Sequence, residues 1–311
     1  MEMRRIGSLS VPAVGLGCNN FGGRLDYDAT VRVLDAALEA GVNFLDTADI
    51  YGSTHSEEFM GRALQGCRDR IVLATKFGMR IDDARQGGRP EYARKACDDS
   101  LARLRTDHID LYQYHRPDPD VPIADTLGAM NDLVKAGKVR EIGCSNFSVA
   151  QLQEAERAAA GGGARFVSVQ NEFSLLHREP ETDGVLAECV RQGIAFIPYF
   201  PLASGLLTGK YHLGQPAPEG TRLSSGPRAP QLTNDALAIV EKLRAFAESR
   251  GHTLLELAMS WLAQQPAVAS VIAGATKAEQ VRGNAAAAGW KMKPAELEEL
   301  DRIVPRGFVR A

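Results

Sequence analysis

Short apolar segments with the composition of buried strands alternate with segments of helical period along almost the whole chain. Counted from Val14, the pattern predicts eight strands with helices between them. This alternation is typical of a (β/α)8 barrel, although a doubly wound open sheet has the same periodicity. We prefer the barrel because most predicted strands end in polar residues, which suits a barrel mouth. The strands are expected at 14–17, 42–46, 71–75, 108–114, 139–144, 166–169, 194–198 and 268–272.

The segments around this pattern predict a hairpin before the barrel and extra helices after it. Residues 5–6 and 9–11 flank Gly7-Ser8, a pair typical of a type II′ hairpin turn. The stretch 201–233, rich in Gly, Pro and Ser, is too long for an ordinary connection, so we expect it to be functional or mobile. We expect one domain over residues 1–311, with helices at 28–40, 56–64, 90–104, 123–135, 183–192, 235–249, 253–264 and 294–304, and others beginning at Ser148 and Thr276.

Composition argues against several classes of function. The chain has 36 Lys and Arg against 39 Asp and Glu, a net charge of −3, which gives no sign of a nucleic-acid or membrane-surface partner. No apolar run approaches the roughly 18 residues of a membrane helix, and the N-terminus lacks the apolar core of a secretory signal. The 5 cysteines are scattered without a CxxC, which argues against disulfides or a zinc site and indicates a cytoplasmic protein.

Polar residues at three predicted strand ends suggest one chemistry. Asp46 and Tyr51 follow one strand, Lys76 ends the next, and His115 ends the third. A tyrosine with a pKa of about 10 is a weak acid at neutral pH, and a neighbouring lysine cation lowers that pKa. Asp46 can supply the carboxylate that the lysine needs, and the histidine can orient a carbonyl or assist proton transfer. The set suits addition of a hydride to C=O followed by protonation of the oxygen.

Taken singly, each of these four residues has a structural interpretation, such as a buried ion pair or a rim aromatic, but their convergence favours a catalytic site. A second site is expected for phosphate at Gly274–Glu279. There Thr276 and Glu279 fit a capping box, and a helix N-terminus beside Lys277 can bind an anion. A Rossmann phosphate loop is not expected, because Asn20 occupies the third glycine position of that fingerprint.

The motifs of this chain resemble those of the aldo-keto reductase superfamily over essentially its whole length. The resemblance is to bacterial-type members, nearer the branches of potassium-channel β subunits and aryl-alcohol dehydrogenases. It implies a (β/α)8 barrel plugged by the hairpin, with NADPH, or NADH, bound across the mouth. It also implies reduction of aldehydes, ketones or sugar-like carbonyls by a catalytic tetrad of Asp46, Tyr51, Lys76 and His115, with Tyr51 as general acid. The matching segments are FLDTADIYG, VLATKFG, DLYQYHRPD, EIGCSNFS, VQNEFS, IPYFPLASGLLTGKY and VIAGATKAEQVRGN.

The resemblance further implies contacts along the whole cofactor. Tyr199 would stack on the nicotinamide, and its carboxamide would be held by Ser145, Asn146 and Gln170. The pyrophosphate would be clasped by Pro201, Leu202, Ala203, Ser204, Gly205 and Lys210. The adenosine-phosphate end would contact Gly274, Thr276, Lys277, Gln280 and Asn284. Arg222 resembles a residue that reaches the 2′-phosphate in the branch of the channel β subunits.

The chain departs from the family pattern at the adenosine end. Gly283 stands where many members have an acid that contacts adenine, and Gln280 stands where many have an arginine. We predict that NADPH is preferred through Arg222 and Lys277.

Substrate specificity stays open in the sequence. Phe200 replaces a common serine beside the stacking tyrosine, and Phe21, Met79 and Phe200 are predicted to line the substrate pocket, which would suit aryl or alkyl carbonyls. Three arginines would instead suit polar or acidic substrates: Arg24, Arg80 and Arg116. The sequence does not indicate an oligomeric state.

Two other functions remain as alternatives to a carbonyl reductase. One is a binding protein that senses NADPH with little turnover, as the channel β subunits do. The other is a lyase in which Lys76 forms a Schiff base, which a neighbouring Asp46 disfavours because it keeps the amine protonated.

Overall fold

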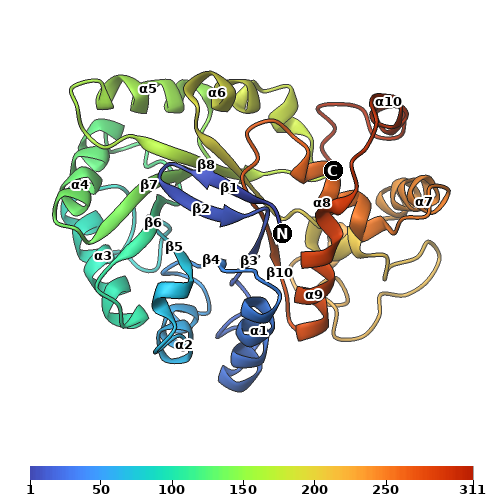
Figure 1. The fold of residues 1–311 in the computed structure, drawn as a ribbon, viewed down its shortest axis with the longest axis horizontal. Helices are drawn as coiled ribbons and strands as arrows, with labels where there is room; N and C mark the ends of the chain where they lie inside the picture. Colours follow the sequence, from blue (N-terminus) through green and yellow to red (C-terminus); the bar gives the residue numbers. More distant parts are fainter. Residues whose placement is uncertain (311) are drawn as a thin grey trace.

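The computed structural model describes residues 1–310, and its core is a barrel of eight parallel strands, as the sequence predicted (Figure 1). The strands follow one another around the barrel in chain order, and helices surround them. Most strand positions are buried, because one face of the sheet packs against helices and the other against a filled lumen. The strands are β3 (Val14–Gly17), β4 (Phe44–Asp46), β5 (Val72–Phe77), β6 (Ile109–Tyr114), β7 (Val139–Ser145), β8 (Phe166–Glu172), β9 (Ala195–Tyr199) and β10 (Val271–Gly274).

The sheet closes between β9 and β10, which rules out the open sheet. Phe196 of β9 pairs in parallel with Val268, just before β10, and β10 pairs with β3. The segment 268–272, predicted as one strand, is therefore two pieces. Between them Ser270 turns its hydroxyl to the carbonyl oxygen of Pro12, at 2.8 Å.

The predicted hairpin is present and covers the end of the barrel at which the strands begin. β1 (Met3–Ile6) pairs antiparallel with β2 (Leu9–Pro12), and Gly7 adopts a φ of +55° in the turn, a conformation that glycine adopts without strain. The backbone N–H of Ser8 donates to Glu141 near the start of β7, at 2.7 Å. The apolar side chains of the hairpin share a core cluster with lumen residues of the barrel strands: Ile6, Leu9, Val11, Phe44, Leu111 and Ile197.

The helices agree with the predicted positions to within a few residues. Ser148 caps α5 and forms a capping box with Gln151, as predicted. Gly41 and Gly193, with positive φ, follow two of the helices that precede strands. The helices are α1 (Tyr27–Glu39), α2 (His55–Ala63), α3 (Pro90–Leu104), α4 (Ile123–Lys135), α5 (Val149–Ala159), α6 (Val185–Gln192), α7 (Asn234–Glu248), α8 (Leu254–Ala263), α9 (Ala278–Ala286) and α10 (Pro294–Ile303).

The start of α9 corrects one prediction. The helix is capped at Lys277, whose backbone is extended, so Thr276 lies outside the helix and forms no capping box with Glu279. Instead, Oε1 of Gln280 accepts hydrogen bonds from the backbone N–H and the hydroxyl of Thr276, at 2.7 and 3.2 Å.

The long segment after β9 contains only short 3-10 turns, η3 (Ala203–Thr208) and η4 (Ala229–Gln231). Within it, Tyr211 and Leu223 are buried, so part of this segment packs against the core. Within residues 1–310, the helices are all too short or too polar to cross a membrane.

Candidate active site

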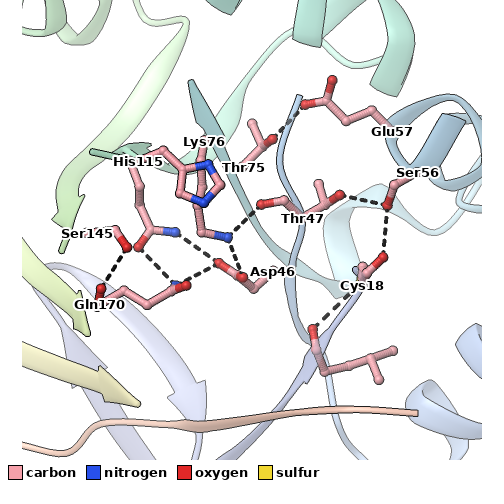
Figure 2. A network of polar contacts seen from close by, with 12 residues as sticks. Cys18, Asp46, Thr47, Ser56, Glu57, Thr75, Lys76, His115, Ser145 and Gln170 are labelled. Atoms are coloured by element: carbon pink, nitrogen blue, oxygen red, sulfur yellow. Dashed lines mark hydrogen bonds and ion pairs between the residues drawn. The ribbon is translucent and has the colours of Figure 1, made fainter. Parts of the chain in front are cut away.

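Adjacent strands bring polar side chains to one level of the lumen, near the ends of the strands. β4 ends at Asp46, and Lys76 of β5 pairs in register with Gln113 of β6. Ser145 of β7 pairs with Gln170 of β8. In Figure 2 the side chains of Asp46, Lys76 and Gln170 point toward one another. Because side chains alternate between the two faces of a strand, this register determines which of them enter the lumen.

Asp46 and Lys76 form a buried ion pair (Figure 2). Nζ of Lys76 lies 2.5 Å from Oδ2 of Asp46 and donates a second hydrogen bond to the carbonyl oxygen of Thr47, at 2.8 Å. Oδ1 of Asp46 accepts from the amides of Gln113 and Gln170, at 2.9 and 3.0 Å. Buried charges tolerate desolvation only when paired and fully hydrogen-bonded, and the carboxylate meets both conditions.

Tyr51 lies on the loop after β4, close to this ion pair. Nζ of Lys76 is 5.2 Å from the centroid of the Tyr51 ring. Burial raises the pKa of Tyr51 above its usual value, and the Lys76 cation offsets part of the increase. The predicted effect of the lysine is present, but burial outweighs it. Burial would lower the pKa of Lys76, but Asp46 and Tyr51 raise it above its usual value, so the amine is an ammonium ion at neutral pH.

His115 follows β6 and faces the same place. Its ring centroid lies 6.0 Å from that of Tyr51, with the two planes nearly perpendicular at 82°. Burial, together with the charges of Lys76 and Arg116, holds the pKa of His115 well below its usual range, so the imidazole is neutral. Its Nδ1 is buried and has no hydrogen-bond partner among residues 1–310. A neutral ring of this kind can donate or accept one hydrogen bond from a bound molecule.

A chain of hydrogen bonds links the ends of β7, β8 and β9. The hydroxyl of Ser145 donates to the carbonyl oxygen of Gln170 at 2.7 Å, and Nδ2 of Asn146 donates to the Ser145 oxygen at 3.0 Å. The hydroxyl of Tyr199 donates to Oδ1 of Asn146 at 2.9 Å. Asn146 has a φ of +60°, which asparagine tolerates better than most residues. These side chains form a fixed polar wall beside Asp46.

Most of these groups line a cavity of about 780 Å³ at the barrel mouth. That volume lies in the upper part of the range of ligand pockets, which is roughly 300–1,000 Å³. Most of the predicted site residues line it: Asp46, Tyr51, His115, Ser145, Asn146, Gln170, Tyr199, Pro201, Leu202, Ser204, Gly205, Lys210, Arg222, Gly274, Thr276, Gln280 and Asn284. Met79 and Phe200, predicted for the substrate pocket, line it too.

Four of the predicted catalytic, cofactor and pocket residues lie outside the lining, and so does Arg80, one of the three arginines considered for polar substrates. Lys76 is completely buried behind Asp46, and Ala203 is buried in η3. Lys277 is exposed at the start of α9 and does not reach the cavity wall. Phe21 has no exposed surface and packs in the core with Leu16 and residues of α1, so the structure does not place it in the substrate pocket. Phe21 follows a predicted strand end, and in the sequence that position is compatible with both a pocket wall and the core.

The lining of the cavity is rich in cations. Lys210 and Arg222 approach each other there, and burial, followed by the charge of Arg24, lowers the pKa of both groups. Arg222 donates to Oδ1 of Asn20 at 2.6 Å, and Asn20 donates to the carbonyl oxygen of Ala275 at 3.1 Å. Among the described residues, the cations that line the cavity have no ion-pair partner: Arg24, Arg116, Lys210, Arg222 and Arg228.

Three residues of the site were not predicted from the sequence. Gln113 is buried on the lumen face of β6, where the strand composition gives no sign of function. Asn20 lines the cavity and holds Arg222. The guanidinium of Arg228 lies 4.2 Å from the centroid of the Phe200 ring and also lines the cavity.

The fold and the site define a barrel oxidoreductase, and comparison with known proteins identifies its family. The model of the aldo/keto reductase family matches residues 13–305, so the chain belongs to that family. NAD(P)H-dependent reduction of carbonyl compounds is the reaction of this family. A curated relative from Glycine max, "Probable aldo-keto reductase 1", is 33% identical over 308 residues, which are 96% of this chain and 87% of the relative.

Two solved structures have the same fold at similar sequence identity. The glycerol dehydrogenase AKR11B4 from Gluconobacter oxydans has a TM-score of 0.83 and 31% identity, covering 98% of this chain and 95% of that chain. The aldo-keto reductase AKR11C1 from Bacillus halodurans, in its holo form, has a TM-score of 0.82 and 31% identity, covering 98% and 97%. The coverages show that both similarities extend along the whole barrel.

Proposed function

We propose that this protein uses NADPH to reduce aldehydes or ketones to alcohols, with Tyr51 as the proton donor. The observation that carries the proposal is the position of Tyr51 between a buried ammonium ion, Lys76, and a neutral imidazole, His115, in the wall of the cavity at the barrel mouth. No side chain of this group is placed as a nucleophile. Proton transfer to a developing alkoxide is therefore the chemistry that the set supports.

The lining of the cavity supports binding of a dinucleotide. Tyr199, Asn146, Ser145 and Gln170 form the wall beside the ion pair, where they would hold the nicotinamide and its carboxamide. A bound reduced nicotinamide would supply the hydride. Gly205 has a φ of +101°, and a Cβ there would lie 3.1 Å from Nζ of Lys210, so this turn leaves room for a phosphate beside the lysine.

The charges of the cavity favour the phosphorylated cofactor. Among residues 1–310, its five lining cations (Arg24, Arg116, Lys210, Arg222 and Arg228) have no ion pairs, and the lining includes only one carboxylate besides the paired Asp46, that of Glu279. A 2′-phosphate adds roughly 1.5–2 negative charges to the ligand. We therefore propose that the protein binds NADPH more tightly than NADH, chiefly through Arg222. The same residue supports placing the chain nearer the channel β-subunit branch of the family. Lys277 lies off the cavity wall and is a weaker candidate than Arg222.

The protein groups would act in a defined order on a bound carbonyl compound. His115 would donate a hydrogen bond to the carbonyl oxygen and orient it toward Tyr51. Tyr51 would then give its proton to that oxygen as negative charge develops there. Lys76 would stabilise the tyrosinate that remains, and Asp46 would keep the lysine in place and charged.

The alternatives are less well supported. A Schiff base requires a neutral, accessible amine, whereas Lys76 is buried and its pKa is raised. A cofactor sensor with little turnover would keep the same cavity. It remains the second candidate because the family includes proteins with an intact tetrad and a binding role. Met79 and Phe200 offer apolar surface to a substrate and Arg116 offers a charge, so the substrate panel needs both kinds of carbonyl.

The test is NADPH consumption against a panel of aldehydes and ketones, for the wild type and for Tyr51→Phe. We expect the variant to bind NADPH normally and to lose roughly 10²–10⁴-fold in kcat, the usual contribution of a general acid. Phe59→Leu is a suitable control, because it changes an aromatic residue of α2 outside the cavity lining. Turnover that survives Tyr51→Phe would refute Tyr51 as donor, and tight NADPH binding without any turnover would favour the sensor.

A further inference from the structure

We propose that Gln113 is a positioning residue for catalysis, which fixes the carboxylate of Asp46 and, through it, Lys76 beside Tyr51. The inference rests on the proposed reductase function. Gln113 is the lumen residue of β6 at the level of Lys76, and it has no exposed surface. It does not line the cavity, so it acts through Asp46 and touches no substrate.

The contacts of Gln113 form a closed triangle. Its Nε2 donates to Oδ1 of Asp46 at 2.9 Å, and its Oε1 accepts from Nε2 of Gln170 at 3.3 Å. Gln170 closes the triangle by donating to the same Oδ1 at 3.0 Å. Both amides are therefore held in one orientation. Oδ2, the other oxygen of Asp46, is left for Nζ of Lys76.

The barrel makes space for this side chain. Gly143 of β7 is the register partner of Gln113, and a Cβ there would lie 2.4 Å from Oγ of Ser168 and 3.4 Å from Cγ of Gln113. The absence of a side chain at Gly143 thus lets the glutamine fill the lumen. A shorter or branched residue at Gln113 would not reach Asp46 from this strand.

An amide is the group that the arrangement requires. A cation at this position would compete with Lys76 for Asp46, and an apolar group would leave Oδ1 with one donor. A neutral donor satisfies the carboxylate without adding charge beside Tyr51. Two of the three N–H groups of Lys76 are then used by Asp46 and Thr47, and one is left to face the proton donor.

Substitution by an isosteric acid tests this role through pH. The titratable groups around the position are Asp46, Tyr51, Lys76, His115 and Cys18. The neighbouring strands add Glu141 of β7, which accepts from Ser8 of the hairpin, Cys144 of β7, which packs in the core outside the barrel, and Glu172 at the end of β8. In Gln113→Glu, the protonated acid can donate to Asp46 as the amide does. Once it ionises, two carboxylates face each other, and their repulsion disturbs the arrangement that positions Lys76.

The experiment compares kcat, KM and NADPH affinity of Gln113→Met and Gln113→Glu with the wild type across pH. For Gln113→Met we expect kcat to fall about tenfold or more, since a hydrogen bond to a charged group is lost, with the KM for the carbonyl substrate within about twofold. For Gln113→Glu we expect nearly wild-type kcat at low pH and a new alkaline limb in the profile that the wild type lacks. Ser260→Ala is the control: Ser260 of α8 is also buried, forms hydrogen bonds with the backbone of Ala287 and Trp290, and lies outside the cavity lining.

The outcomes separate this inference from the proposed function. A wild type without turnover on any carbonyl would overturn the reductase proposal. A wild type with turnover, matched by Gln113→Met within about twofold, would overturn the role of Gln113 alone. If Gln113→Met does not fold, the profile of Gln113→Glu decides: a pH dependence identical to that of the wild type refutes the positioning role.

Discussion

The clearest physical test of the site is removal of the charge of Asp46. In Asp46→Asn, Lys76 stays completely buried but loses its counter-charge. Breaking one partner of a buried pair costs about 3–5 kcal/mol, so we expect the free energy of unfolding at pH 7 to fall by that amount. At about 2 °C per kcal/mol for a chain of this size, Tm should fall by roughly 6–10 °C. Urea unfolding followed by the fluorescence of Trp261 and Trp290 measures the change.

The pH dependence of the same variant tests the cause. In the wild type the partners of Lys76 raise its pKa. Its contribution to the free energy of unfolding is therefore fully present below the unfolded-state pKa of about 10.4, and it is lost only as pH rises through the higher pKa of the folded state. In Asp46→Asn, burial acts without the carboxylate and lowers that pKa. The folded variant then binds fewer protons than the unfolded chain, so its stability rises with pH up to about 10.4 and the gap to the wild type narrows.

Two further variants make the result decisive. The double variant Asp46→Asn/Lys76→Met removes the unpaired charge and should recover most of the lost stability, because apolar replacements of buried pairs are often neutral. Asp99→Asn breaks an exposed i,i+4 pair with Lys95 and should cost less than about 0.5 kcal/mol. If Asp46→Asn costs no more than Asp99→Asn at pH 7 and shows no added pH dependence, Lys76 does not depend on Asp46 for its charge and our reading of the site is wrong.

The other predictions concern a second carboxylate and the cofactor. Burial, followed by the charge of Glu57, raises the pKa of Asp49 to about 7, and within the described part of the chain neither of its oxygens has a hydrogen-bond partner. Because the folded chain binds this proton more tightly, stability should decline by up to about 4 kcal/mol as pH rises from 4 to 7, and urea titrations of Asp49→Asn should lack this decline. Arg222→Gln should weaken NADPH binding about tenfold or more and leave NADH within about twofold, measured by fluorescence titration; an equal loss for both would exclude a 2′-phosphate contact.

Most of the fold could be predicted because local signals agreed with it. Apolar strands, capped helices and glycine stops recur with one order along the chain, and family motifs fall at the strand ends. The division at Ser270 could not be predicted, because its bond to Pro12 joins residues at opposite ends of the sequence. The cap at Lys277 was missed for a different reason. Thr276 has the right spacing for a capping box, and only the extended backbone of Lys277 places it outside the helix.

The site could be predicted at strand ends but not inside strands. Asp46, Lys76 and His115 interrupt the apolar pattern where strands stop, and that interruption is visible in sequence. Gln113 differs because its role depends on register. Its side chain faces Asp46 across the lumen, whereas its neighbours Tyr112 and Tyr114 pack in the core outside the barrel.

The same register explains why the ion pair and the amide triangle belong to one structural unit. A slip of one residue in β6 would turn Gln113 toward the helices and a tyrosine into the lumen. Asp46 would then lose a hydrogen-bond donor, and the tyrosine ring would occupy the place of the Gln113 side chain. The hairpin and the lower lumen residues, such as Phe44 and Leu111, resist such a slip because they fill the barrel beneath the polar level. Packing at the closed end of the barrel therefore sets the geometry of the polar groups at its mouth. Leu111→Ala, which empties part of that packing two residues before Gln113 on the same face of β6, is for this reason expected to disturb the Asp46–Lys76 pair without touching it.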